Sequence, residues 1–336
     1  RTVPCQLWFL NTNKPAAMKD KVLMIDARQV YRKVTRKIYD FSPEQQKNIT
    51  SIVWLYRGET GRFIELVKSY IDRTLAEAAK SFGADSHAAK VELSRVADDT
   101  TEWMPERVLP EYIELCVKID TAVNRFIKSL KDSGTVDEPY KEFRESLAGL
   151  KDETETFRKT ADKLYTDWNK KQRSKPADLA AFIEGRNTLE LLAEQSRDLV
   201  KLADHVFKLA GRVIEICEKE LNARESKDWD SGINSSRKDS LKKLADETRK
   251  AAVEQLKQVR YFYRQAHWLI TRFPDGKLAD VKGLVKLVTF EELKANDWSL
   301  TPGRYVGVAP EEVDEDFDFE ERLREMWAHF LGPHGN

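Results

Sequence analysis

Histidine and cysteine are the side chains in this sequence best suited to bind a metal or act as a nucleophile. The histidines show no H-E-x-x-H or other metal-ligand spacing, and the cysteines lie about a hundred residues apart without a C-x-x-C pair. No G-x-S-x-G nucleophile motif occurs. The sequence therefore predicts no catalytic residue and no metal site, with His205 and His267 in packing or surface roles and the cysteines as free thiols.

A cluster of bases is the other feature that could do chemistry. Residues 21–40 hold six Lys or Arg against two Asp, a local charge of +4. Such a cluster can bind DNA phosphates, and the affinity would then fall with salt. The alternative, of about equal weight, is a solvated helix face. The candidate phosphate contacts are Arg28, Arg32, Lys33, Arg36 and Lys37.

The composition limits the class of protein. The 336 residues include 57 bases and 57 acids, so the net charge is zero, and this balance excludes a strongly basic protein that coats nucleic acid. Apolar residues make up 41%, with few Gly and Pro, which fits a helix-rich globular chain. No apolar stretch approaches the roughly 20 residues of a membrane span, and no secretion signal is visible. We therefore expect a cytoplasmic protein without membrane contact.

The basic cluster begins within the first thirty residues, so the structure of this segment determines where its first bases lie. Residues 6–10 and 21–26 are short aromatic or β-branched runs, which predict two strands covered on both faces of a larger sheet. Two strands are not stable alone, so they must pair with strands outside this chain or be covered by later segments.

Helical periodicity begins near Val30. Ser42-Pro43-Glu44-Gln45 has the pattern of a capped helix start. From about residue 107 to 272 the pattern predicts four long helices with coiled-coil seams, which form a bundle with each other, with a partner's helices, or with both. The third of these helices carries a row at intervals of seven, the candidate docking seam: Leu192, Leu199, Val206 and Val213.

The end of the chain has a different character. Residues 283–288 predict a short strand, Thr289-Phe290-Glu291-Glu292 a capped short helix, and Thr301-Pro302-Gly303 a turn. Residues 311–321 hold eight acids and no base and lead into a predicted helix over 319–330. We thus expect terminal strands over 1–30, a helical connection over 31–106, the antiparallel bundle over 107–272, a strand and turn segment over 273–310, and an acidic helix over 311–336.

Three segments resemble the modification subunit of type I restriction-modification systems. They are Thr2-Val3-Pro4-Cys5-Gln6-Leu7-Trp8-Phe9-Leu10-Asn11 with Val22-Leu23-Met24-Ile25-Asp26-Ala27-Arg28, then Leu55-Tyr56-Arg57-Gly58, and finally Asn296-Asp297-Trp298-Ser299-Leu300-Thr301-Pro302-Gly303-Arg304-Tyr305-Val306-Gly307-Val308. They lie towards the two ends of the sequence, whereas the region between them resembles the family only in being helical.

The resemblance implies a site-specific adenine-N6 DNA methyltransferase. Such subunits use S-adenosylmethionine, methylate a flipped-out adenine held by an Asn/Asp-Pro-Pro-Phe/Tyr motif, and work with a specificity subunit, which a restriction subunit can join. This sequence contains no Pro-Pro and no Gly-rich cofactor turn, and it begins at Arg1. We therefore expect an inactive C-terminal portion, a mainly α long-helix bundle attached to the last strands of a Rossmann-like methyltransferase sheet. The alternative is a non-enzymatic helical scaffold whose similarity to the family is accidental.

Overall fold

A computed structural model describes residues 5–33, 38–83, 107–131, 134–174, 179–235 and 237–309. The chain divides into two compact units. The terminal unit combines Arg1–Tyr31 with Ala279–Asn336, and the bundle unit comprises Arg32–Leu278. Both ends of the chain therefore belong to one unit. The acidic segment expected over 311–336 lies outside the described residues.

A two-stranded antiparallel sheet forms the centre of the terminal unit. Strand β1 (Lys21–Ile25) pairs with β4 (Val285–Thr289), and the Asp26 N–H donates to the Leu284 carbonyl at 2.7 Å just beyond them. Both strands agree with the sequence prediction. The short elements around them are η1 (Ala16–Met18), α8 (Phe290–Ala295) and η5 (Pro302–Arg304).

The strand expected at residues 6–10 is absent. The segment follows no strand geometry, and its four large apolar side chains at 7–10 are exposed rather than covered on both faces. Within the described residues β1 pairs with β4 alone, so the Rossmann-like sheet is not part of the observed structure. β1 and β4 do not form a local hairpin, which a two-residue loop could join. About 260 residues separate them in the sequence, and these residues include the whole bundle unit.

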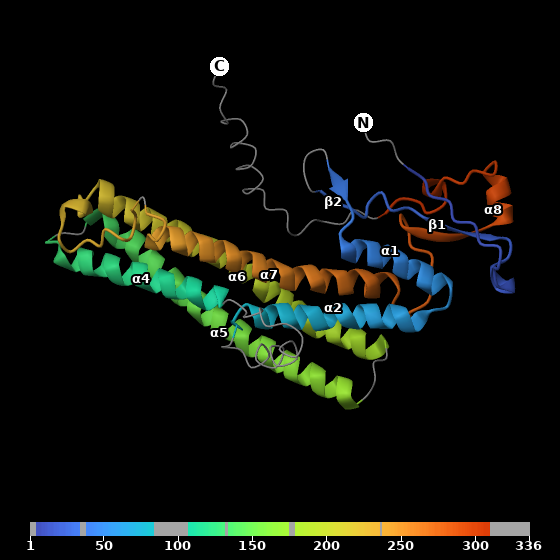
Figure 1. Ribbon diagram of the computed structural model, residues 1–336, viewed down its shortest axis with the longest axis horizontal. Helices are drawn as coiled ribbons and strands as arrows, with labels where there is room; N and C mark the ends of the chain where they lie inside the picture. The colour runs from blue at the N-terminus through green and yellow to red at the C-terminus, as the bar shows by residue number, and fades with distance from the viewer. Residues whose placement is uncertain are drawn as a thin grey trace, which may run out of the picture. The chain divides into compact units, whose positions relative to one another are not determined.

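Long helices build the bundle unit (Figure 1). α7 packs along α2, α4 and α6, and α5 packs along α6. α2 therefore joins the same bundle, which begins before residue 107. The prediction of a mainly α chain is confirmed. The elements are α1 (Pro43–Tyr56), α2 (Thr60–Lys80), α4 (Val108–Ser129), η3 (Gly134–Val136), α5 (Asp137–Ser174), α6 (Leu179–Lys219), η4 (Ala223–Glu225) and α7 (Leu241–Arg272).

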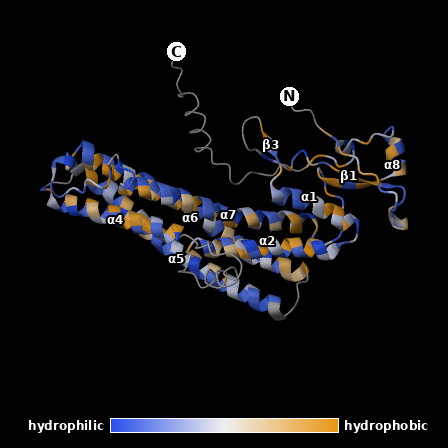
Figure 2. Ribbon diagram, viewed as in Figure 1, coloured by the Kyte–Doolittle hydropathy of each residue, from blue (hydrophilic) through white to orange (hydrophobic). Residues whose placement is uncertain are grey.

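The periodic rows of the long helices form the core of this unit. On α5 the row from Tyr140 to Trp168 is buried almost throughout, as is the row on α7 that includes Ala252 and Val259. Hydrophilic residues occupy the outer faces of the helices (Figure 2). Among the described helices none is long and apolar enough to cross a membrane. The helices thus bury their apolar faces against each other.

The bundle unit is not helical at its start. Arg32–Lys33 (β2) and Tyr39–Asp40 (β3) pair as an antiparallel ribbon, so the helical periodicity placed at Val30 begins too early. The first helix starts instead at the predicted cap. The Ser42 hydroxyl accepts from the Gln45 N–H at 3.1 Å, and the Gln45 side chain accepts from the Ser42 N–H at 2.9 Å.

Candidate functional site

A buried carboxylate holds an arginine directly after β1. Asp26 is 8% exposed, and its Oδ1 accepts from the Arg28 backbone N–H at 3.1 Å and from Nε at 2.9 Å. Its Oδ2 accepts from Arg28 Nη2 at 2.6 Å. These side-chain hydrogen bonds hold the pKa of the Asp26 carboxyl below its usual range and raise the pKa of Arg28. The carboxylate is therefore ionised at neutral pH, and both its oxygens are engaged.

A turn from the other end of the chain closes on this ion pair. A Cβ built at Gly303 would lie 2.6 Å from Arg28 Nη2 and 3.3 Å from Asp26 Oδ2, so a larger residue would displace the guanidinium. The Gln6 amide donates to Thr301 Oγ1 at 3.4 Å. Three separated segments thus converge, and each of them belongs to the sequences that carry the family resemblance.

A small apolar core supports the ion pair and the turn. Met24, Val288, Leu293 and Val306 are buried together. The capping box predicted at Thr289 is present: its Oγ1 accepts from the Glu292 N–H at 3.3 Å, and Glu292 accepts from the Thr289 N–H at 2.9 Å. The four residues come from β1, β4, α8 and the segment after η5, so this core joins both ends of the chain in one unit.

The terminal unit leaves a sheet edge and an apolar segment uncovered. In the described residues β1 pairs with no strand other than β4. The Lys14 ammonium donates to the Lys21 carbonyl of β1 at 2.6 Å. Leu7, Trp8, Phe9 and Leu10 are 81%, 68%, 89% and 93% exposed. Four consecutive exposed apolar side chains are typical of a surface that another protein segment covers.

The structure divides the predicted phosphate contacts between the two units. Arg28 belongs to the terminal unit and is held by Asp26, with its side chain 69% exposed. Arg32 lies on the β2–β3 ribbon of the bundle unit, where Nε and Nη2 donate to Asp40 at 2.6 and 3.0 Å. The Lys33 side chain and the whole of Arg36 and Lys37 lie outside the described residues. The described part of the cluster contains no helix, so the solvated helix face is not observed there. DNA contact stays a prediction.

A polar network that the sequence did not reveal anchors the start of α1. The Tyr261 hydroxyl lies 2.7 Å from the Ser42 hydroxyl and donates to Glu44 Oε2 at 2.9 Å. The Asn48 amide donates to Gln265 Oε1 at 2.9 Å. Burial raises the pKa of Tyr261 to about 12, so it remains a hydrogen-bond donor at neutral pH. The network fixes α1 against α7. The sequence gives no sign of it, because its members are isolated polar residues that do not recur with the period of a helix or a strand.

The candidate docking seam lies inside the bundle. Leu192, Leu199, Val206 and Val213 are 0%, 2%, 0% and 0% exposed on α6, which packs against α5 and α7. The chain's own helices therefore fill this seam, and a partner could reach it only by opening the bundle. This corrects the assignment of the four residues to partner docking.

Neither a metal nor the expected cofactor has a site in the described residues. No three His, Cys, Asp or Glu side chains gather there as metal ligands. His205 and His267 are exposed, and the His267 ring lies 5.8 Å from the Tyr263 ring. The packing or surface roles expected of both stay a prediction. In dinucleotide-binding folds a carboxylate near a strand end binds ribose hydroxyls, and S-adenosylmethionine carries a ribose of the same kind. Asp26 follows a strand, but Arg28 engages both its oxygens, so Asp26 does not fit that contact.

Comparison with known proteins gives one family. Residues 1–96 match the family model described as N-6 DNA methylase, which supports a relationship to adenine-N6 DNA methyltransferases. The match covers the exposed apolar segment, β1, the Asp26–Arg28 pair, the β2–β3 ribbon and the first two helices. No curated protein and no solved structure matches the chain.

Proposed function

We propose that this chain is the C-terminal part of a site-specific adenine-N6 DNA methyltransferase, the modification subunit of a type I restriction-modification system. The observation that carries the proposal is the convergence of Asp26, Arg28 and Gly303 in one unit. The first two residues lie in the segment that matches N-6 DNA methylases, and Gly303 comes from the turn that resembles the end of the modification subunit. An accidental similarity at either end would give no reason for the two segments to meet.

In the proposal the two units have different roles. The outer edge of β1 and residues 7–10 are the surface that a catalytic sheet would cover by adding a strand. That sheet would supply the Asn/Asp-Pro-Pro-Phe/Tyr motif and the S-adenosylmethionine site, while this chain alone is inactive. In the proposal the bundle docks on a specificity subunit through the outer faces of its helices, because its inner seam is filled.

DNA is the substrate in this proposal, and a restriction subunit can join the complex in the cytoplasm. In the proposal the side chains of this chain that meet DNA phosphates are those of the basic cluster, Arg28, Arg32, Lys33, Arg36 and Lys37. Arg28 and Arg32 contribute less, because Asp26 and Asp40 offset their charges.

The test begins with the coding sequence upstream of Arg1. An in-frame Gly-rich turn after a strand, followed by Asn/Asp-Pro-Pro-Phe/Tyr, is the expected finding. The complete reading frame, expressed with its specificity subunit, should then produce N6-methyladenine in cellular DNA, measured by mass spectrometry of nucleosides. Alanine in place of the motif's Asn or Asp is the control and should remove the signal. An upstream stop codon followed by a nearby start codon would refute the proposal.

The non-enzymatic scaffold remains the second candidate, and one observation favours it. The bundle buries its own seams, so it needs no partner to hide them. A scaffold should be monodisperse by light scattering when it is purified alone. The methyltransferase portion should instead self-associate through residues 7–10, and Trp8→Ser with Phe9→Ser should reduce that association. Replacement of the solitary exposed Leu191 by Ser is the control and should leave association unchanged.

A further inference from the structure

The C-terminal half of α7 carries bases without acids. No acidic residue occurs between Glu254 and Asp275, although acids make up about one residue in six of the whole sequence. The same stretch holds four bases, which are Lys257, Arg260, Arg264 and Arg272. The first three are three and four residues apart, so they lie on one face of the helix. We call this face the basic stripe.

The basic stripe is open to solvent. Lys257 and Arg264 are exposed, and Arg260 is half-buried. The residues of α7 between them point elsewhere: Tyr261 contacts the start of α1, and Phe262 is buried. Hydrophilic side chains accordingly cover the outer face of α7 (Figure 2).

Acids lie at the borders of the stripe rather than among its bases. Burial raises the pKa of Tyr263 to about 12, and the acids near enough to contribute are Glu190 and Glu194 of α6, opposed by Arg186. Glu254, one turn before the stripe, accepts from the Gln258 amide at 3.1 Å. When these four charged neighbours are counted with the four bases of α7, the net charge is +2.

The fold brings a second basic element beside the stripe. The Tyr261 hydroxyl lies 2.7 Å from the Ser42 hydroxyl. Asp40, two residues before Ser42, pairs with Arg32 at 2.6 Å on the β2–β3 ribbon. The ribbon therefore lies next to this part of α7, more than two hundred residues away in the sequence, and both belong to the bundle unit. Two basic segments thus share one side of that unit.

This surface fits a polyanion better than a protein partner. Among the residues that the structure describes, no exposed large apolar side chain lies on α7. Protein interfaces usually have apolar or aromatic anchors at their centre, whereas phosphate contacts need none. Three of the four bases are Arg, whose planar guanidinium can bind two phosphate oxygens at once. From Lys257 to Arg272 they extend over about 22 Å of helix.

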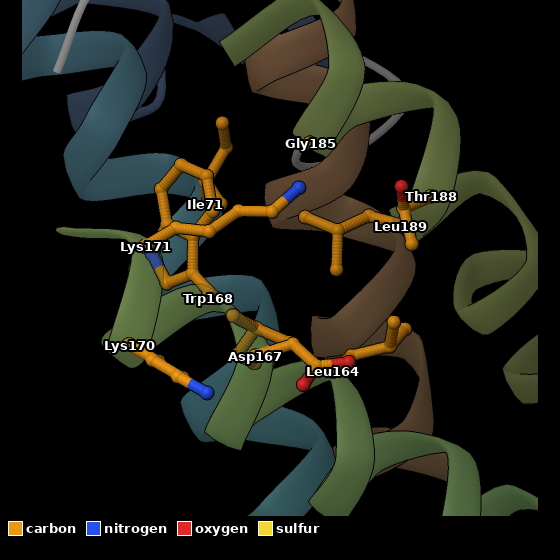
Figure 3. A pocket seen from close by; sticks show the side chains of 10 residues that line it. Ile71, Leu164, Asp167, Trp168, Lys170, Lys171, Gly185, Thr188 and Leu189 are labelled. Atoms are coloured by element: carbon orange, nitrogen blue, oxygen red, sulfur yellow. The ribbon is translucent and has the colours of Figure 1, made fainter. Parts of the chain in front are cut away.

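A hollow where α2, α5 and α6 meet offers no comparable surface (Figure 3). Its volume is about 380 Å³, and the buried Ile71 contributes to an apolar floor. Lys170 and Lys171 line the hollow, but Asp167 lines it as well, and Lys171 pairs with Glu184 at 3.1 Å. Charges of both signs meet there, so the hollow does not favour an anion.

We propose that the basic stripe of α7, together with the adjoining ribbon, binds the phosphate backbone of duplex DNA. The choice of DNA as the polyanion rests on the proposed function, whereas the surface itself follows from the fold. Contacts to phosphates carry no sequence information. The stripe therefore holds DNA without selecting its sequence.

Fluorescence anisotropy with a labelled duplex and the full chain tests the proposal. Lys257→Gln with Arg264→Gln removes two exposed charges from the stripe. The slope of log affinity against log salt concentration should become shallower by about 1.8, which is about 0.9 for each lost phosphate contact, and Kd should rise by more than about tenfold near 0.1 M salt. A second duplex of unrelated sequence should show the same loss.

The matched control is Lys201→Gln with Lys208→Gln on α6. These two bases are also exposed and also seven residues apart, so the control removes the same charge at the same spacing. Its affinity and salt slope should equal those of wild type, and circular dichroism should show that both double variants remain helical.

Three results would overturn the proposal. They are no binding of the duplex by wild type, an equal loss in the control, or a wild-type salt slope in the Lys257 and Arg264 double variant. If that variant kept its DNA binding but lost co-purification with the specificity subunit, the stripe would serve a protein partner instead. None of these results depends on the upstream reading frame or on N6-methyladenine in cellular DNA, so this proposal and the proposed function fail separately.

Discussion

Two neighbouring leucines on α6 provide a sharp test of where the seam faces. Leu192 is 0% exposed and Leu191 is 54% exposed, although the two stand side by side in sequence. Leu192→Ala removes three buried carbon atoms, at about 0.8 kcal/mol each, and the cavity left behind raises the total cost to roughly 3–5 kcal/mol. Leu191→Ala, the same chemical change on an exposed face, should stay within about 0.5 kcal/mol.

Thermal unfolding followed by circular dichroism measures the difference. For a unit of this size a loss of 3 kcal/mol lowers Tm by roughly 6–12 °C, so Leu192→Ala should unfold well before wild type while Leu191→Ala follows it. Equal small effects at both positions would refute the reasoning, because they would mean that Leu192 is not packed inside the bundle. Its seam would then be available to a partner after all.

Three further predictions concern the cap, the ion pair and the basic cluster. Ser42→Ala should cost about 1–2 kcal/mol in urea unfolding through loss of the capping box, whereas Thr50→Ala on the exposed face of the same helix should be nearly neutral. Asp26 has a folded pKa held below its ordinary value of 3.8, so its stabilisation is present above that pH and is lost as the pH falls through the folded pKa. Thermal scans of wild type and Asp26→Asn should therefore differ at pH 7 and converge below pH 3.8; a constant difference would contradict the ionised pair. In the assembled enzyme, Lys33→Gln with Arg36→Gln should weaken DNA binding and reduce the salt slope by about 0.9 per cation, and an unchanged slope would remove both from the interface.

Local patterns in the sequence determined much of the secondary structure. The caps at Ser42 and Thr289 are correct to the residue, because a capping box depends on side chains only three positions apart. The long helices were also predictable, since their apolar residues repeat with the helical period, and β1 and β4 were predictable from short runs rich in apolar and β-branched residues. The resemblance to the modification subunit likewise needed only short contiguous motifs, and residues 1–96 do match N-6 DNA methylases.

Only the tertiary structure decided which surfaces these elements bury. From the sequence alone, the seam at Leu199 could have faced a partner or a neighbouring helix, because a heptad row predicts that it is buried but not which helix covers it. In the structure α5 and α7 of the same chain cover it. Residues 6–10 have strand composition but no strand, since a strand needs a neighbour and the described residues provide none. The meeting of Asp26 with Gly303 and of Glu44 with Tyr261 joins residues more than two hundred positions apart. Isolated polar side chains carry no period, so their partners follow only from the packing of the elements that bear them.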